Sequence, residues 1–166
     1  MRSSTRITLL VLGWMWMAGG MAATFTGTVT EVRDGDTLTV AVDGRPLTVS
    51  IAGIDAPELR QPFGMQSRES LNVLCLQRTA VIRSPGAPAS GAENAGRAKA
   101  IKGSVACADE DVASHQIRAG MAWVTGRGDR RAPLYLLEDE AQRAHAGLWI
   151  DKQPVPPWTW RRMKHR

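Results

Sequence analysis

The stretch of sequence that decides the fold is residues 25–58, FTGTVTEVRDGDTLTVAVDGRPLTVSIAGIDAPE. Apolar and polar residues alternate through three parts of it, which are Phe25–Val32, Thr37–Val42 and Leu47–Ile51. Such alternation is typical of β-strands with one buried face. The two connections contain Asp34-Gly35-Asp36 and Asp43-Gly44-Arg45-Pro46, which are rich in turn residues. The stretch therefore predicts a meander of three antiparallel strands.

The residues beyond the meander predict further elements within one domain. The composition is that of an ordinary globular chain, with 43% hydrophobic and 22% charged residues among 166. Apolar spacing predicts helices at 65–76, 109–119 and 133–147, and strands at 79–82 and 98–107. The last helix would bury one stripe of side chains, Leu134, Leu137, Ala141, Ala144 and Leu148. Residues 84–96, rich in Pro, Gly, Ala and Ser, are expected to form a long loop.

These elements fit an α+β, mainly β fold. The expected architecture is a five-stranded barrel of the oligonucleotide/oligosaccharide-binding (OB) type with about three α-helices. Too little chain lies on either side of the 84–96 loop to form two separate cores.

Residues 1–23 have the composition of a secretory signal peptide. Arg2 and Arg6 precede an uncharged apolar run at 7–17, and small residues dominate 18–23. A membrane anchor is the alternative, but the run is shorter than the roughly 20 residues that a spanning helix needs. We therefore expect cleavage after residue 22 or 23 and a periplasmic or secreted protein. The rest of the chain divides into a domain at 24–162 and a basic tail at 163–166.

Positive charge is concentrated at the C-terminus. The formal net charge is +5, and it falls to +3 once Arg2 and Arg6 are removed. Four basic residues lie among the last six, which are Arg161, Arg162, Lys164 and Arg166, so the remaining body is nearly neutral. A terminal run of this kind can bind a polyanion, but such charges are more often only solvated. Charge alone therefore does not indicate a nucleic-acid-binding protein.

Cys75 and Cys107 are the two cysteines of the chain. In an oxidising compartment they could form one disulfide, which would stabilise the fold by about 3 to 4 kcal/mol. The alternative is two buried thiols that pack as small apolar groups. Neither the cysteines nor the three histidines have the spacing of a zinc site.

Three carboxylates are expected to meet at one end of the meander. Asp36 lies in the turn after the first strand, and Asp55 and Glu58 follow the third strand. In an up-down-up meander these positions lie close together, and clustered carboxylates need a cation or a proton to offset their repulsion. Calcium suits such a cluster because it takes hard oxygen ligands in irregular geometry. The alternative is that the first segment is only a turn and Asp55 only caps a loop before Pro57.

Taken together, six segments closely resemble the staphylococcal nuclease (thermonuclease) family in order and spacing. They are Asp34-Gly-Asp-Thr37, Gly53-Ile-Asp-Ala-Pro-Glu58 after a gap of fifteen residues, Gln61-Pro-Phe-Gly64, Arg118-Ala-Gly-Met-Ala-Trp123, Gly147-Leu-Trp149 and Pro156-Pro-Trp-Thr-Trp-Arg-Arg162. The resemblance runs from Phe25 to Arg162 and is greatest to the exported bacterial branch. It implies an OB-fold, calcium-dependent phosphodiesterase that cuts DNA and RNA with little sequence preference.

The resemblance also implies roles for individual residues. Asp36, Asp55 and the backbone carbonyl of Ala56 would bind Ca²⁺, and Glu58 would orient or deprotonate the attacking water. Metal-assisted hydrolysis with a carboxylate base is sound phosphodiester chemistry. The implied partner is single-stranded DNA or RNA, and we expect a monomer that keeps no membrane span after processing.

The arginines depart from the family pattern. Ser50 stands where the family has an arginine on the third strand, and a hydroxyl cannot replace a bidentate cation. Arg97 best matches the second family arginine, although an ungapped alignment would place Ala100 there. Lys99 or Lys102 could substitute as a point charge.

The aromatic residues depart from the family pattern too. The base-stacking tyrosines of the family are missing, and Tyr135 is the only tyrosine. Trp158 and Trp160 could stack on bases, or could fix the C-terminus onto the barrel.

Three functions follow as hypotheses. The first is an exported calcium-dependent nuclease, with activity reduced by Ser50. The second is a non-catalytic OB-fold module that binds nucleic acid or another polyanion through its basic residues. The third is a structural or interaction protein in which calcium only stabilises the fold.

Overall fold

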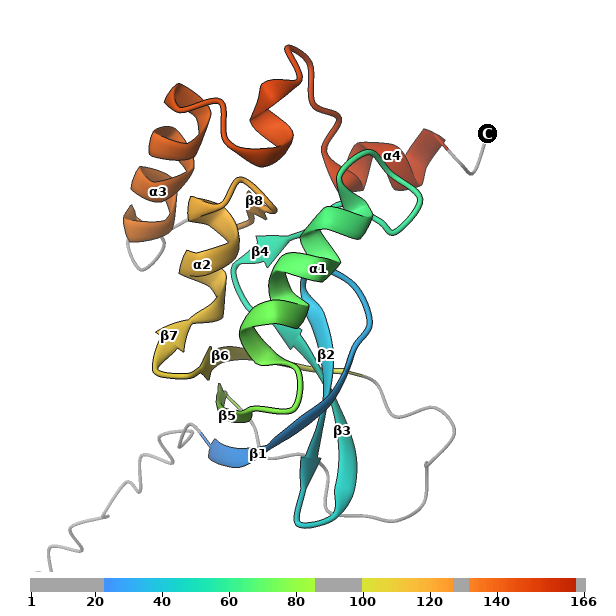
Figure 1. The fold of residues 1–166 in the computed structure, drawn as a ribbon, viewed down its shortest axis with the longest axis vertical. Coiled ribbons are helices and arrows are strands. Elements are labelled where there is room, and N and C mark those ends of the chain that lie inside the picture. Colours follow the sequence, from blue (N-terminus) through green and yellow to red (C-terminus); the bar gives the residue numbers. More distant parts are fainter. Residues whose placement is uncertain (1–22, 86–99, 127–131, 164–166) are drawn as a thin grey trace, which may run out of the picture.

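The computed structural model describes residues 23–85, 100–126 and 132–163 (Figure 1). Residues 1–22 of the expected signal peptide, most of the 84–96 loop and the last three residues of the basic tail lie outside these ranges. Arg97 and Lys99 also lie outside the described residues.

The described chain forms the expected barrel. Its strands are β1 (Ala23–Val32), β2 (Thr37–Val42), β3 (Arg45–Ile51), β5 (Thr79–Ser84) and β6 (Ile101–Cys107). They follow the order β3-β2-β1-β5-β6, and a parallel pairing of β3 with β6 closes the sheet on itself. The predicted meander is confirmed, because β1 pairs with β2 and β2 with β3, both antiparallel. The α+β fold with a closed five-stranded barrel is therefore confirmed.

Strand β1 belongs to both sides of the barrel. Its first half pairs with β5 through Ala23–Thr28, and its second half pairs with β2 through Thr28–Val32. The register shifts between Val29 and Glu31, as in a β-bulge. A bulge bends its strand, so one strand can serve both neighbours.

The barrel interior holds the alternate residues of the strands. They are fully or almost fully buried, as the period-two pattern predicts: Val29, Leu38, Val40, Val49, Ile51, Ile82 and Val105. Leu71 from the first helix and Ile117 from the second extend this core outside the barrel. The core thus fixes the positions of the two helices.

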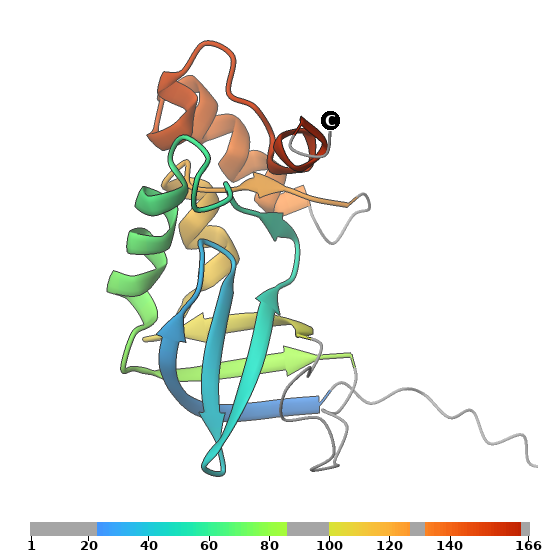
Figure 2. The same cartoon turned by 90° about the vertical axis from the view of Figure 1, so that its right-hand side faces the viewer.

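The helices differ from the prediction in number and limits. They are α1 (Gly64–Cys75), α2 (Val112–Arg118), α3 (Ala132–Arg143) and α4 (Pro157–Met163), with a 3₁₀ helix, η2, at Gly147–Ile150. Figures 1 and 2 show α3 and α4 at one end of the barrel, together with the loop that precedes α1. Four α-helices are present where about three were expected, because α4 was not predicted.

Helix α2 begins three residues later than predicted. Asp111 is its N-cap, since the Asp111 side chain accepts a hydrogen bond from the Ser114 N–H at 2.8 Å. Glu110 and Asp111 form the short strand β7 beside β6. The predicted start at residue 109 was therefore wrong.

Helix α3 ends at Arg143, so the predicted end at Gly147 was also wrong. His145 adopts a left-handed conformation (φ 51°), its N–H donates to the Gln142 carbonyl, and the Ala146 N–H donates to the Ala141 carbonyl. This pattern is a Schellman motif, which ends a helix. Leu148 is buried as expected, but from η2 rather than from the helix.

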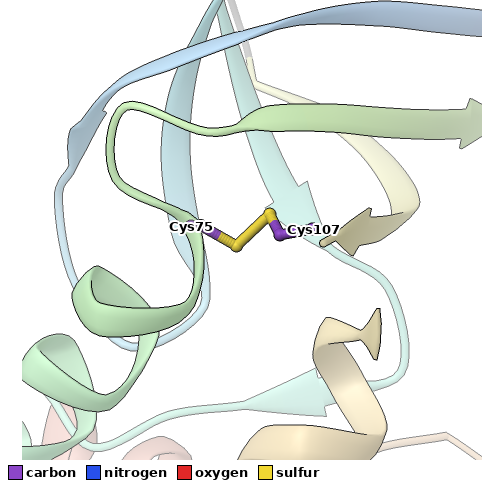
Figure 3. The surroundings of a disulfide bond; sticks show 2 residues. All are labelled: Cys75 and Cys107. Atoms are coloured by element: carbon purple, nitrogen blue, oxygen red, sulfur yellow. A yellow bond between two sulfur atoms is a disulfide. The ribbon is translucent and has the colours of Figure 1, made fainter. Parts of the chain in front are cut away.

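A disulfide joins Cys75 at the end of α1 to Cys107 at the end of β6 (Figure 3). Both residues are fully buried, and their Cα atoms lie 5.4 Å apart. Of the two alternatives left open by the sequence, the structure has the bonded one. The bridge ties α1 to the barrel.

Two short strands lie beside the end of the barrel that carries α3 and α4. Strand β4 (Ile54–Asp55) pairs antiparallel with β8 (Trp123–Val124).

Within the described ranges, no helix has both the length and the apolar character that a membrane span requires.

Candidate active site

The turn between β1 and β2 is fixed against the end of β3. The Asp36 N–H donates to the Asp34 carboxylate at 3.1 Å, and the Arg33 N–H donates to the Thr37 carbonyl at 2.9 Å. The Ile51 N–H donates to the Asp36 carbonyl at 2.8 Å. Asp36 therefore lies beside the segment that leaves β3.

The Asp36 carboxylate points into that segment. Its Oδ2 accepts from the Ala56 N–H at 2.8 Å, and its Oδ1 accepts from the Thr37 hydroxyl at 2.9 Å. Asp36 is 20 residues from Ala56 in sequence. The structure thus brings Asp36 next to Asp55 and Ala56, as the meander implied.

Buried side chains of α1 and α2 contact this turn and fix its position. The Gln116 side-chain amide on α2 donates to the Gly35 carbonyl at 2.7 Å and to the Ser67 carbonyl at 3.0 Å. Gly35 also packs too closely for any side chain, since an added Cβ would lie 1.8 Å from Ser67 Oγ and 2.7 Å from Ala56 Cβ. The turn is therefore fixed to α1 and α2 as well as to β3.

Among the residues that the structure describes, four acidic and two basic ones line one open pocket of about 420 Å³. They are Asp34, Asp36, Asp55, Glu58, Lys102 and Arg161. Ser50 also lines this pocket and is the register partner of Lys102 where β3 and β6 run parallel. The predicted acidic cluster therefore faces a solvent-accessible site, and Lys102 lies beside Ser50 on its wall.

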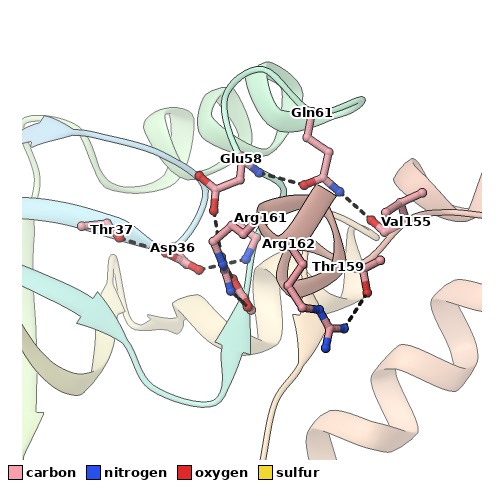
Figure 4. Close-up of polar contacts among 10 residues, drawn as sticks. Asp36, Thr37, Glu58, Gln61, Val155, Thr159, Arg161 and Arg162 are labelled. Atoms are coloured by element: carbon pink, nitrogen blue, oxygen red, sulfur yellow. Dashed lines mark hydrogen bonds and ion pairs between the residues drawn. The ribbon is translucent and has the colours of Figure 1, made fainter. Parts of the chain in front are cut away.

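Arg161 on α4 also lines this pocket, and its guanidinium lies beside Glu58 (Figure 4). Its Nη2 donates to Asp55 Oδ2 at 2.7 Å, and its Nη1 donates to Asp55 Oδ1 at 3.2 Å and to Glu58 Oε1 at 2.8 Å. These hydrogen bonds raise the pKa of Arg161 above its usual value, and those to Asp55 contribute more than the one to Glu58. Arg161 is thus a part of the site.

In the sequence, Arg161 belongs only to a basic C-terminal run, and its position in the pocket was not predicted. Arg161 is separated from Asp55 by 106 residues, so no local spacing links the two. Its one available signal was the Pro156–Arg162 motif, in which the sequence indicated roles only for Trp158 and Trp160.

The segment after Glu58 is tied to the segment before α4. The Gln61 side chain is buried, accepts from the Glu58 N–H at 3.2 Å, and donates to the Val155 carbonyl. Figure 4 shows Gln61 between these two partners. Because one side chain spans both segments, the positions of Glu58 and of α4 are coupled.

A family model described as staphylococcal nuclease homologue matches residues 48–151. An Escherichia coli protein named as an uncharacterized endonuclease is 32% identical over 165 residues, covering 99% of this chain and 100% of the relative. The chain belongs to the staphylococcal nuclease family. Another relative, the Shigella flexneri micrococcal nuclease, is 30% identical over 151 residues, covering 84% of this chain and 82% of that protein. The sequence resemblance to the family is confirmed.

The donor set of this staphylococcal nuclease homologue suits a hard cation. Asp36 and Asp55 supply carboxylate oxygens in one pocket, and the Ala56 carbonyl belongs to the same segment. Across residues 23–85, 100–126 and 132–163, no three His, Cys, Asp or Glu side chains converge closely enough to hold a metal together. The expected ligand set needs only two carboxylates, and calcium completes its shell with carbonyls and water.

The remaining candidate residues are divided between the pocket and the barrel end. Lys102 lines the pocket, whereas Ala100 lies just before β6 and does not line it. Trp158 packs edge-on against Trp123, with ring centroids 6.4 Å apart, which favours its role in fixing α4 to the barrel. Trp123 is itself the register partner of Asp55.

The electrostatics of the pocket make Asp36 hard to ionise. Burial, and after it the neighbouring charges of Asp34 and Asp55, raise the pKa of Asp36 to about 7. Hydrogen bonds from Ala56 and Thr37 oppose this shift but do not cancel it. A site that raises a carboxyl pKa in this way favours the binding of a cation or a proton.

This pKa predicts how the stability of the metal-free protein depends on pH. Between an unfolded-state pKa of 3.8 and a folded-state pKa of about 7, the folded state binds more protons at Asp36 than the unfolded state does. Asp36 therefore lowers the free energy of unfolding as the pH rises through this window, by on the order of a few kcal/mol. Urea denaturation in chelator, with wild type compared with Asp36→Asn, measures the effect. A difference between the two proteins that does not change with pH would contradict the expectation.

Proposed function

We propose that this nuclease is an exported, calcium-dependent phosphodiesterase that hydrolyses DNA and RNA with little sequence preference. The observation that carries the proposal is the grouping of Asp36, Asp55 and Glu58 in one open pocket. The membership of the chain in the staphylococcal nuclease family indicates the reaction class, and the pocket contains residues suited to that reaction. We further propose that the rate of hydrolysis is lower than in relatives with an arginine on this strand, because the Ser50 hydroxyl cannot replace a guanidinium.

Asp36, Asp55 and the Ala56 carbonyl would hold the calcium ion. When bound there, the ion would polarise a phosphoryl oxygen and offset negative charge as it develops. The fixed turn at Gly35 and the Ile51–Asp36 hydrogen bond hold Asp36 in place before the ion arrives. Such preorganisation avoids the cost of assembling ligands during binding.

Glu58 would accept a proton from the attacking water. Its side chain is 41% exposed and lines the pocket, so water can reach it. The Gln61 amide oxygen fixes the Glu58 backbone by accepting from its N–H. A carboxylate positioned in this way contributes on the order of 10² to 10⁴ in rate as a general base.

The lining of the pocket accounts for low sequence preference. None of its described lining residues is aromatic, and Lys102 and Arg161 are groups that bind phosphate rather than base edges. Contacts to phosphate position a strand without reading its sequence. The same lining therefore suits both DNA and RNA.

Export is supported by two features of different kinds. Residues 1–23 have the basic, apolar and small-residue order of a signal peptide. Cys75 and Cys107 form a disulfide, which persists in oxidising compartments and is rare in the cytosol. The proposed location is accordingly the periplasm or the medium.

Digestion of single-stranded DNA and of RNA by the purified protein tests the proposal. We expect cleavage in calcium and a loss of at least about a hundredfold in chelator, because the ion supplies several kcal/mol of transition-state stabilisation. Restoring calcium after chelation should restore the rate. Salt-sensitive binding without cleavage would contradict the proposal and select the binding module instead.

A further inference from the structure

We propose that Arg161 is a substrate-binding residue of this active site. In the metal-free chain its guanidinium holds Asp55 and Glu58, and in the loaded site it turns to a phosphate oxygen of the bound nucleic acid. The inference rests on the proposed function, since it takes the substrate to be a phosphodiester.

The fold places Arg161 at the site through contacts of α4 with the rest of the molecule. Pro157, the first residue of α4, is buried, and Trp158 packs on Trp123. Gln61 joins the segment before α4 to the loop that carries Glu58. Arg161 is therefore presented by an anchored helix, not by a solvated tail.

The guanidinium has the geometry of a phosphate ligand. It already binds two oxygens of Asp55 with two nitrogens, at 2.7 and 3.2 Å, and a phosphate offers the same fork-like pair of acceptors. The Arg161 side chain is 46% exposed, so an incoming strand can reach it. The Asp55 side chain is only 18% exposed.

The charge of the pocket requires such a cation. Lys102 is the other basic residue among the described residues that line the pocket, against four carboxylates. Both Asp55 oxygens accept hydrogen bonds from Arg161, so a metal ion at Asp55 competes with the guanidinium for the same carboxylate. When the metal site fills, Arg161 turns from Asp55 to a phosphate in the same pocket, which offers the same pair of acceptor oxygens.

Two properties should consequently change in opposite directions on Arg161→Ala. The variant should bind calcium about three- to tenfold more tightly, because a competitor for Asp55 is gone and exposed ion pairs are worth up to about 1 kcal/mol each. It should also lose on the order of a hundredfold in kcat, as expected when one donor to the phosphoryl oxygens is removed. If Arg161 only held Asp55 in place, its loss would weaken calcium binding, and if it were only an ion-pair partner of Asp55, its loss would tighten calcium binding without lowering kcat.

Arg162→Ala is the matched control. Arg162 lies next to Arg161 on the same helix, but it donates to Thr159 and does not line the pocket (Figure 4). The two variants lose the same charge from α4, so their difference isolates the position of the guanidinium. Calcium affinity is measured by calorimetry, and kcat and KM are measured on single-stranded DNA. Arg162→Ala should change kcat and calcium affinity by no more than about twofold.

A relocated guanidinium provides a second arm. Ser50→Arg, made in the Arg161→Ala background, puts the fork on the β3 wall of the same pocket. It should recover at least about tenfold of the lost kcat, because the phosphate needs the donor and not the helix that carries it. Arg161→Lys should recover less, since a lysine has no fork.

The outcomes separate the inference from the proposed function. If wild type does not cleave in calcium, the proposed function fails, and Arg161 is then judged by the binding of fluorescent oligothymidylate in calcium. That binding is measured in the Glu58→Gln background, with Arg161→Ala expected to weaken it about tenfold more than Arg162→Ala does. Equal binding in these variants, equal kcat of Arg161→Ala and Arg162→Ala, or a rise in kcat on Arg161→Ala overturns the inference.

Discussion

Glu58→Gln is expected to lower kcat on single-stranded DNA by about 10²- to 10⁴-fold, with little change in calcium affinity. Glutamine has the same size and can still accept the hydrogen bond that Arg161 donates at 2.8 Å. It cannot take a proton from water at neutral pH, so only the base is lost. Steady-state kinetics at saturating calcium, together with calorimetric calcium titration, measure the two effects separately.

Glu69→Gln serves as the control for Glu58→Gln. Glu69 lies on α1, is exposed, and does not line the pocket of Asp36 and Asp55. The kcat of the Glu69→Gln variant should stay within about twofold of the wild-type value, because changes to exposed charges away from a site have small effects. A Glu58→Gln enzyme that keeps more than about a tenth of the wild-type kcat would show that another group takes the proton.

Asp36→Asn is expected to weaken calcium binding by at least about a hundredfold. Loss of groups that only support metal ligands already costs 10- to 100-fold in affinity, and Asp36 is proposed as a ligand itself. The same variant should make the metal-free protein more stable at about pH 8, because a buried carboxylate no longer has to ionise there. The predicted signs of the two effects are therefore opposite, which a general folding defect would not produce.

Calcium titration and thermal unfolding, each with and without calcium, test this pair of effects. Asp43→Asn is the control, since Asp43 is exposed in the turn between β2 and β3 and does not line the pocket. The prediction fails if Asp36→Asn keeps the calcium-induced rise in melting temperature of the wild-type protein.

Much of the fold was predictable because its determinants are local. The alternation in Phe25–Ile51 specifies which faces of three strands are buried, and the two short turns specify that neighbouring strands are antiparallel. The helix limits were less accurate. The end of α3 depends on a left-handed conformation at His145, a residue type that does not mark such a position as glycine does.

The candidate site was predictable to the extent that it depends on the same local rules. Asp36 and Asp55 lie next to strand ends that the meander brings together, so their proximity follows from sequence order. Lys102 lines the pocket because β3 and β6 pair in parallel, with Ser50 opposite Lys102. This pairing closes the barrel and cannot be derived from either segment alone. Arg97 stays a prediction, since it lies outside the described residues.

The sequence by itself thus determined the meander and the proximity of Asp36 to Asp55, because each depends on residue patterns and turns of a few neighbouring positions, whereas the barrel was predicted from the resemblance of six segments to the family. Only the tertiary structure decided that Cys75 bonds to Cys107 and that Arg161 lies against Asp55 and Glu58. Both decisions join residues that are distant in the chain. Their proximity depends on how helices pack on a closed barrel, and no local spacing encodes that packing.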